Sequence, residues 1–356
     1  MQEIWEAASF QELADIRNRL LDASALSPRN RAAELASLVV YVNLIHDRIL
    51  QQSVHLAVRK LEGMGLGTPP VPFAFLLFGS GGRQEQALVS DQDNGLIYQL
   101  TADASKDEQV EVENYFHLLG AAIVQGMEEV GYPPCHGHVT CIHRRWRGSV
   151  EEWKTKYEEW ATNPVWENAR YLLLAGDARV LYGHHSVYEP VEQLYHRLLT
   201  DHTELLSRLV SNILHYRVPL GWFGRIYREV HGRYRGAINL KNGIYLPYVN
   251  AIRHHALANG IQATTTLERI SALRRRGDWS SGWTDEIDHY FRQLLGLRLV
   301  APLHWKESDY NSNSYLMLSD LPAETIGMIR TAMKHALKLQ RMTAQLPQQA
   351  QGRRLR

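Results

Sequence analysis

The stretch that decides the fold runs from Phe73 to Tyr98 and reads FAFLLFGSGGRQEQALVSDQDNGLIY. Its first six residues are an unbroken apolar run, with prolines before it and glycines after it, which is typical of a buried strand. The glycine-rich turn 79–83 follows, and residues 84–88 are expected to form a short helix. Residues 91–98 read as the next strand. Together these segments predict the centre of a small α/β unit.

The segments on either side of this unit carry helical patterns. Apolar residues recur at helical spacing over residues 10–61, with a break expected at Ser27–Asn30. Glycines and prolines at 63–72 form the clearest linker in the chain. Beyond the unit, residues 111–130 predict an amphipathic helix and residues 139–142 a third strand.

From Val150 onward the pattern is helical almost throughout. The expected fold class is therefore α+β, a small mixed-sheet domain between helical parts. The expected divisions are a helical segment at 1–65, the α/β domain at 66–185, a helical substrate-binding domain at 186–345 and a flexible tail at 346–356.

Composition narrows the class of protein further. The chain has 356 residues, 45% of them hydrophobic and 22% charged, which is typical of a globular protein with two domains. Lys and Arg number 39 against 38 Asp and Glu, a net charge of +1, so nothing in the bulk charge favours nucleic acid or a membrane as partner. The chain shows no secretory signal, no apolar run of about 18 residues and only two cysteines. We expect a cytoplasmic protein, while its oligomeric state cannot be read from the sequence.

Two acidic residues and a glycine turn are the candidates for chemistry. Residues i and i+2 of a strand point the same way, so Asp91 and Asp93 would present two carboxylates on one face. Such oxygens suit Mg²⁺ or Mn²⁺. The Gly79–Ser80 turn lets backbone amides approach a phosphate, and Arg83 adds a permanent positive charge. The combination predicts a site for a triphosphate and a metal ion.

Other assignments of these motifs are weaker. A glycine turn or an Asp-x-Asp pair alone is common in loops and at strand ends. The turn lacks the Gly-Lys-Ser/Thr of a Walker loop and the spacing of a dinucleotide fingerprint. A crowded set of cysteines and histidines follows no standard zinc spacing, so no zinc site is expected from it: Cys135, His136, His138, Cys141 and His143. Trp222 and Phe223 are expected to pack in the core rather than to stack on a base.

Residues 77–94 resemble the signature of the nucleotidyltransferase superfamily of DNA polymerase beta. They are similar in particular to the branch that includes PII uridylyltransferase and uncharacterised nucleotidyltransferases often fused to cyclic-nucleotide-binding and CBS domains. Later segments resemble the same branch and its C-terminal substrate-binding domain: 131–137, 177–183, 219–223, 239–241 and 266–269.

The resemblance implies a Mg²⁺-dependent transfer of a nucleoside monophosphate from a nucleoside triphosphate to a hydroxyl of an acceptor, either a protein or a small molecule. By the same resemblance, Gly79 and Ser80 would hold the phosphates, and Asp91 and Asp93 would be catalytic metal ligands. Lys241 would reach phosphate or substrate.

Two departures from the family keep other functions open. Asn239 stands where the family has Asp, and the expected third strand carries no carboxylate. Asp177 is the candidate for a third metal ligand, and its alternative is an ion pair with Arg179 or a helix cap. The chain could then be a nucleotide-binding regulator without turnover, or a module whose helical bundle binds another protein. The intact pair Asp91 and Asp93 favours catalysis.

Overall fold

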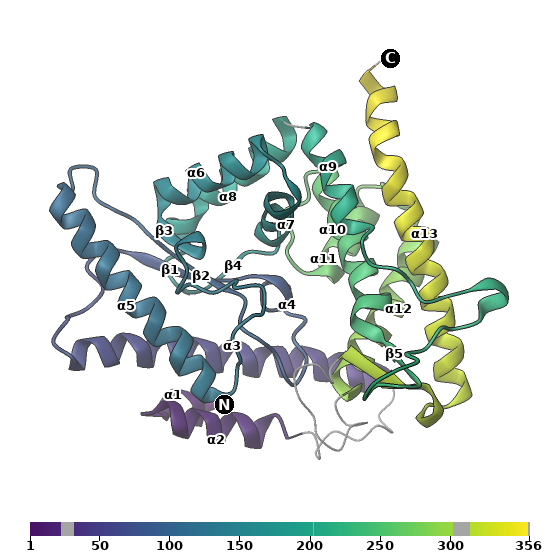
Figure 1. The fold of residues 1–356 in the computed structure, drawn as a ribbon, viewed down its shortest axis with the longest axis horizontal. Helices are drawn as coiled ribbons and strands as arrows, with labels where there is room; N and C mark the ends of the chain where they lie inside the picture. Colours follow the sequence, from purple (N-terminus) through teal and green to yellow (C-terminus); the bar gives the residue numbers. More distant parts are fainter. Residues whose placement is uncertain (23–31, 202, 302–313, 355–356) are drawn as a thin grey trace. The chain divides into compact units, whose positions relative to one another are not determined.

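The computed structural model describes residues 1–22, 32–201, 203–301 and 314–354, which form two compact units (Figure 1). Each unit is assembled from segments that are separate in the sequence. The first unit comprises Met1–Asp22, Val40–Asn163 and Asp177–Arg197. The second comprises the described residues of Ala23–Val39, Pro164–Gly176 and Leu198–Arg356.

A mixed sheet lies at the centre of the first unit. Its order is β3-β2-β1-β4, with β1 antiparallel to both β2 and β4, and β2 parallel to β3. Every residue of β1 and β2 is buried, as the apolar run predicted, because both faces of these strands are covered. The strands are β1 (Phe73–Leu77), β2 (Asn94–Tyr98), β3 (Arg147–Ser149) and β4 (Arg179–Gly183).

Helices supply the aromatic cover on the two faces of this sheet. On one face, α5 (Lys106–Val130) stacks Phe116 on Tyr98 with ring centroids 4.5 Å apart. On the other, α6 (Val150–Thr162) brings Trp153 beside Phe78, and the Trp153 indole donates a hydrogen bond to the Leu96 carbonyl. The unit also contains α1 (Gln2–Glu6), α2 (Phe10–Leu20), most of α3 (Ala32–Gly63), η2 (Arg144–Trp146) and most of α8 (His185–Asp201).

Local capping decides where the two sheet-covering helices begin and end. Ser105 and Glu108 form a reciprocal capping box at the start of α5. Ser149 and Glu152 form another at the start of α6. At its other end α5 stops at Gly131, which adopts the left-handed conformation with φ 104°. The chain therefore leaves α5 at a defined point, and the segment that follows can run beside the residues before β2.

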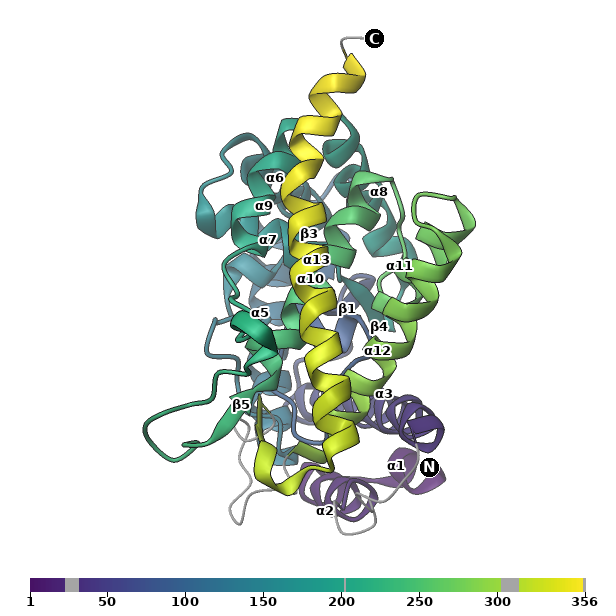
Figure 2. The ribbon, with the colours of Figure 1, turned by 90° about the vertical axis from the view of Figure 1, so that its right-hand side faces the viewer.

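The second unit is helical, with a small two-stranded sheet. Strand β5 (Ala237–Asn239) pairs antiparallel with β6 (Tyr315–Met317), and a π-helical turn, η4 (Lys241–Tyr245), leads into the buried helix α10 (Leu246–Ala258). Figure 2 shows α13 (Ala323–Arg354) along this unit and the segment between η3 and β5 projecting from it. The other elements are α7 (Trp166–Ala175), α9 (Thr203–Ile213), η3 (Trp222–Gly224), α11 (Thr266–Arg275), α12 (Ser281–Val300) and η7 (Leu318–Asp320).

The expected α+β class is confirmed, with corrections to single elements. Residues 139–142 form no strand, since they turn beneath β2, where Val139 accepts a hydrogen bond from the Asn94 amide. The helix after β1 is α4 (Gly79–Gly82) rather than 84–88, because Gln84 has φ 56° and cannot continue it. The break expected at Ser27–Asn30 lies outside the described residues.

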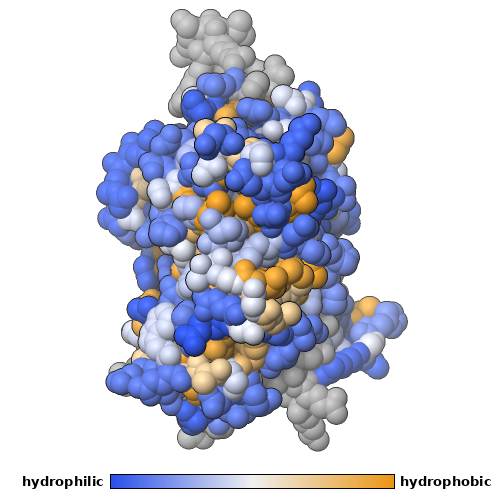
Figure 3. All heavy atoms as spheres, turned by 90° about the vertical axis from the view of Figure 1, so that its left-hand side faces the viewer, coloured by the Kyte–Doolittle hydropathy of each residue, from blue (hydrophilic) through white to orange (hydrophobic). Residues whose placement is uncertain are grey.

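A second correction concerns exposed aromatic residues. The expectation that Trp222 and Phe223 pack in the core is wrong, since they are 86% and 104% exposed. Phe223 has φ 56°, in a tight turn that directs both rings away from the unit. On the face drawn in Figure 3, polar side chains predominate and apolar ones form small separate groups. No helix in the part of the chain that the structure describes is long and apolar enough to cross a bilayer.

Candidate active site

The glycine turn after β1 is tied directly to the acidic segment before β2. The Phe78 amide, at the extended residue between β1 and the helical turn that follows, donates to the Asp93 carbonyl over 2.9 Å. Gly79 follows with φ 54°, a conformation that L side chains rarely adopt. A Cβ atom on Gly79 would lie 2.5 Å from Asp93 Oδ2, so glycine is required for the turn to approach this carboxylate.

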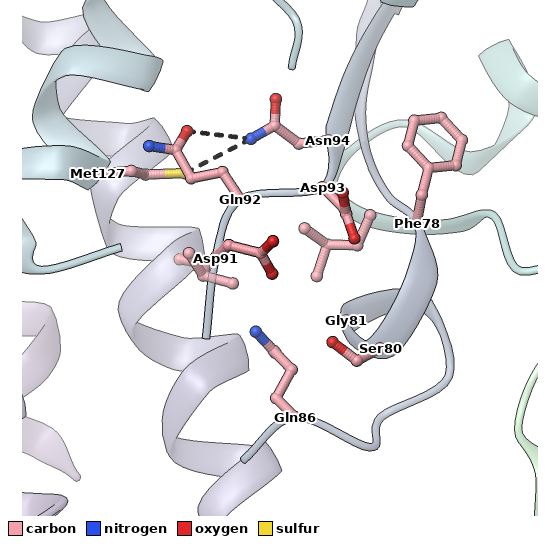
Figure 4. Close-up of a pocket in the computed structure, with 11 residues that line it drawn as sticks. Phe78, Ser80, Gly81, Gln86, Asp91, Gln92, Asp93, Asn94 and Met127 are labelled. Carbon is pink, nitrogen blue, oxygen red and sulfur yellow. Dashed lines mark hydrogen bonds between the residues drawn. The ribbon is translucent and has the colours of Figure 1, made fainter. Parts of the chain in front are cut away.

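Buried and partly exposed side chains alternate along the acidic segment 91–94. The buried ones are side-chain amides, and the partly exposed ones are carboxylates. Gln92 donates from Nε2 to the Val124 and Tyr132 carbonyls, over 3.1 and 2.8 Å. The amides of Gln92 and Asn94 are buried and hydrogen-bonded to each other. The residues between and before them, Asp93 and Asp91, are partly exposed and line a pocket on the other side (Figure 4). The buried amides anchor the segment, and the carboxylates face the pocket.

The side chain of Cys135 lies close to the two carboxylates. One oxygen of Asp91, one of Asp93 and the sulfur of Cys135 lie within 4.8 Å of one another. Burial raises the pKa of the Cys135 thiol to about 12, and the negative charges of Asp93 and Asp91 act in the same direction. The thiol therefore carries its proton at neutral pH.

The pocket beside these groups is lined by both the glycine turn and the acidic segment (Figure 4). Ser80 and Gly81 contribute from α4, and Gln86 from the loop that follows. Asn43 holds Gln86 in place, since its side chain accepts from the Gln86 amide over 2.8 Å and donates to the Gln86 carbonyl. The side-chain oxygen of Gln86 is buried and has no hydrogen-bond partner within the part of the chain that the structure describes.

These residues fit a divalent cation. Two carboxylates face the same space, and a Cβ would fill the gap between Gly79 and Asp93. Gln86, whose side-chain carbonyl oxygen is buried without a partner among the described residues, also lines the pocket. Carboxylate and amide oxygens are the ligands that Mg²⁺ and Mn²⁺ prefer.

Arg83, predicted to bind nucleotide, forms ion pairs with two buried carboxylates. Its guanidinium is 4% exposed and forms ion pairs with Glu85 at 2.8 Å and Asp177 at 2.5 Å. Asp177 is fully buried and is not part of the group formed by Asp91 and Asp93. Its predicted alternative partner, Arg179, instead pairs with Asp47. The geometry favours a structural role for Arg83 and Asp177 over nucleotide and metal binding.

Lys241 lies in the second unit, as the first residue of the π-helical turn η4. The neighbouring Asn239 accepts a hydrogen bond from the Asn242 amide over 2.8 Å, so it caps this turn. A role for Lys241 in binding phosphate or substrate stays a prediction.

Two residues of the site were not predicted from the sequence. Cys135 was set aside because its spacing to nearby histidines matches no zinc pattern. Cys135 comes close to the acidic segment through the fold rather than through the sequence. The preceding residue, Pro134, pairs with Gln92 as neighbouring parallel strands do. Gln86 offered no signal, because a single glutamine after a glycine turn is unremarkable.

Two known families match parts of this chain. The first unit, with its small mixed sheet, glycine turn and acid pair, has the parts of a nucleotidyltransferase domain. Residues 20–167 match the family described as Putative nucleotidyltransferase DUF294. Residues 203–346 match the family described as Putative nucleotidyltransferase substrate binding domain. Two separate parts of the chain thus match models that describe a nucleotidyltransferase and its substrate-binding domain. A comparison with curated proteins finds no match.

Proposed function

We propose that this protein transfers a nucleoside monophosphate from a nucleoside triphosphate to a hydroxyl of an acceptor, with Mg²⁺ or Mn²⁺ as cofactor. The observation that carries the proposal is the acid pair Asp91 and Asp93 beside the Gly79 turn, in a chain that matches both DUF294 models. A triphosphate requires a turn whose backbone amides can approach its phosphates. Its divalent cation requires carboxylate oxygens as ligands.

In this proposal Asp91 and Asp93 hold the divalent cation, and the backbone amides of Gly79 and Ser80 bind phosphate oxygens. Amides in the first turn of a helix have no acceptor within that helix, so those of α4 can point at a ligand. A bound cation would offset the negative charge on the phosphate and the leaving oxygen. The short distance between Gly79 and Asp93 keeps the two binding functions side by side.

The reaction is a substitution at the α-phosphorus. The acceptor oxygen forms a bond to this phosphorus, the bond to the oxygen that bridges to the β-phosphate breaks, and pyrophosphate leaves with that electron pair. The acceptor proton passes to water. The chain contributes mainly by positioning the triphosphate for in-line attack.

We propose a protein or a small molecule as the acceptor, by analogy with PII uridylyltransferase, which residues 77–94 resemble. Lys241 of the substrate-binding domain is proposed to contact phosphate or acceptor. A reducing compartment such as the cytoplasm would keep Cys135 as a thiol, as this site requires.

The test combines labelled nucleotides with a charge-matched pair of variants. Each nucleoside triphosphate, labelled at the α-phosphate, is incubated with the protein, Mg²⁺ and a cell extract, and label transfer and pyrophosphate are measured. Asp91→Asn with Asp93→Asn should reduce transfer about 100-fold or more, because a catalytic cation contributes several kcal/mol. Asp103→Asn with Asp107→Asn removes the same charge from exposed positions and should retain transfer.

Two outcomes would contradict the proposal. Full activity in the Asp91 and Asp93 double variant would refute the metal assignment. A second outcome is thermal stabilisation of the parent protein by nucleotide and Mg²⁺ without any pyrophosphate from any nucleotide. It would identify a nucleotide-binding regulator instead of an enzyme.

A further inference from the structure

Cys135 gives the proposed cation site a soft ligand. Its sulfur and one oxygen each of Asp91 and Asp93 lie within 4.8 Å of one another. In a tetrahedral zinc site the sulfur lies about 2.3 Å and a carboxylate oxygen about 2.1 Å from the metal, which places the two ligand atoms about 3.6 Å apart. The three groups therefore need to close by at most about 1.4 Å to share one ion.

The backbone holds Cys135 at this distance from two sides. On one side, the preceding residues run beside the acidic segment, where the Gln92 amide donates to Pro133 and Gln92 pairs with Pro134. On the other side, the chain turns back at once, since the His138 amide donates to the Cys135 carbonyl over 3.0 Å. The Gly137 amide also donates to the Cys135 sulfur over 3.3 Å. The position of the sulfur is therefore built into the fold.

The two carboxylates suit Mg²⁺, but the addition of a thiol also suits a softer cation. Mg²⁺ binds oxygen ligands and accepts thiolate poorly, whereas Zn²⁺ and Cd²⁺ bind thiolate strongly. The second cysteine of the chain, Cys141, is fully buried against the Gly120 carbonyl and lies outside this cluster. Thiolate ligation at the site can therefore come from Cys135 alone.

We propose that Cys135 joins Asp91 and Asp93 as the third ligand of a thiophilic divalent cation of the zinc class. This cation displaces Mg²⁺ from the nucleotidyl-transfer site and arrests turnover. The inference rests on the proposed function for the arrest of turnover, but the ligation itself can be measured without any activity. The site would thereby report the free zinc concentration of its compartment as a level of activity.

The direct test is a titration of the full chain with Cd²⁺, followed by the ultraviolet charge-transfer band of a cadmium–thiolate bond. The parent protein and Cys141→Ser should both develop the band with a stoichiometry of one cation. Cys135→Ser should not, and circular dichroism checks that each variant is folded. Asp91→Asn with Asp93→Asn should weaken cadmium binding about ten-fold or more, since even outer partners of metal ligands are worth that much.

A band that persists in Cys135→Ser, or that is absent from the parent protein, overturns the inference. So does cadmium binding that the Asp91 and Asp93 double variant leaves unchanged, because the sulfur would then act without the carboxylates.

The second test separates this inference from the proposed function. With Mg²⁺ and nucleotide present, Zn²⁺ should inhibit label transfer by the parent and by Cys141→Ser at the same concentration. Each variant is normalised to its own uninhibited rate, and Cys135→Ser should require about ten-fold more Zn²⁺ for half-inhibition. Equal sensitivity of Cys135→Ser and the parent would overturn the regulatory part. If no nucleotide is transferred at all, the proposed function fails, and the cadmium band still decides whether Cys135 is a ligand.

Discussion

Gly79 is required for two separate reasons. Its φ of 54° is strained for any residue with a side chain. Its α-carbon also approaches Asp93 so closely that a Cβ would lie 2.5 Å from Oδ2. The first reason affects stability, and the second affects the position of the proposed metal ligand. The two effects can be separated, because Gly65 has φ 82° with nothing within 4 Å of a built Cβ.

We therefore predict different results for alanine at these two glycines. Gly65→Ala should lower the free energy of unfolding by about 1 kcal/mol through backbone strain alone. Gly79→Ala should lower it by at least as much and also reduce nucleotidyl transfer about 10- to 100-fold, because Asp93 must move. Urea unfolding and the α-label assay measure the two quantities. Normal transfer by Gly79→Ala would show that the contact between Gly79 and Asp93 does not position a functional group.

For single residues, the sequence predicted which side chains lie on the same side of a segment better than it predicted which side chains they contact. The period of two along a strand was enough to place Asp91 and Asp93 on the same side, since alternation is a local property. One of the ion-pair partners of Arg83, Asp177, lies far along the chain, as does the acid pair beside Cys135. No local pattern encodes such pairings. The position of Arg83 after a glycine turn predicted phosphate binding, whereas the structure pairs its guanidinium with buried carboxylates.

Among the secondary-structure elements, α4 is held in place by two arginines, each of which forms an ion pair. Arg83, at its end, pairs with Asp177 just before β4. Arg179, in β4, pairs with Asp47 of α3 and donates to the Gly81 carbonyl of α4 over 2.9 Å. The turn proposed to bind phosphate is thus fixed to β4 and, through Arg179, to α3. The first pair is fully buried, whereas the side chains of Arg179 and Asp47 are 22% and 13% exposed.

This difference predicts unequal losses of stability. Arg83→Met leaves buried carboxylates without their counter-ion and should cost about 3–5 kcal/mol of the free energy of unfolding. Arg179→Met breaks a partly solvated pair and should cost roughly 1 kcal/mol. Chemical denaturation of the two variants at neutral pH provides the comparison. If Arg83→Met weakened nucleotide binding while stability stayed at the parent level, the arginine would be a phosphate ligand after all.

Long helices and strands with a clear hydrophobic pattern could be predicted from the sequence, whereas short or partly exposed strands could not. Strand β1 and helix α5 were expected from an apolar run and a helical stripe, and both are present. Strands β3 and β4 were missed: β3 has only three residues, and β4 is only partly buried. Such strands show little hydrophobic periodicity, and pairing with β2 and β1 is what makes them strands.

On the scale of the whole chain, the two units are interleaved. The polypeptide leaves the first unit after Asn163, forms α7 in the second, and returns at Asp177 to add β4 to the sheet. The DUF294 match ends at residue 167, before this return. A fragment that ended there would lack the partner strand on one side of β1 and the carboxylate that neutralises Arg83.

Buried histidines in both units connect stability to pH. His46, in the first unit, is hydrogen-bonded to the Tyr132 hydroxyl and the Ala87 carbonyl. Its burial, together with the nearby charge of Arg17, lowers its pKa to about 3. In the second unit, burial lowers the pKa of His254 to about 3 and that of His255 to about 4. All three stay neutral in the folded protein at pH values where the unfolded chain is protonated.

The sign of the pH dependence follows from these shifts. Above the unfolded pKa of about 6.5 neither state binds a proton at these sites, and the folded protein keeps its full stability. As the pH falls toward 4, the unfolded chain takes up protons that the folded protein refuses. Each histidine then lowers the free energy of unfolding by up to about 1.4 kcal/mol per pH unit. Urea midpoints at pH 7.5, 6.5 and 5.5 should therefore decrease, and His46→Gln should show a shallower slope than the parent. A slope that His46→Gln shares with the parent would mean that His46 is protonated in the folded protein.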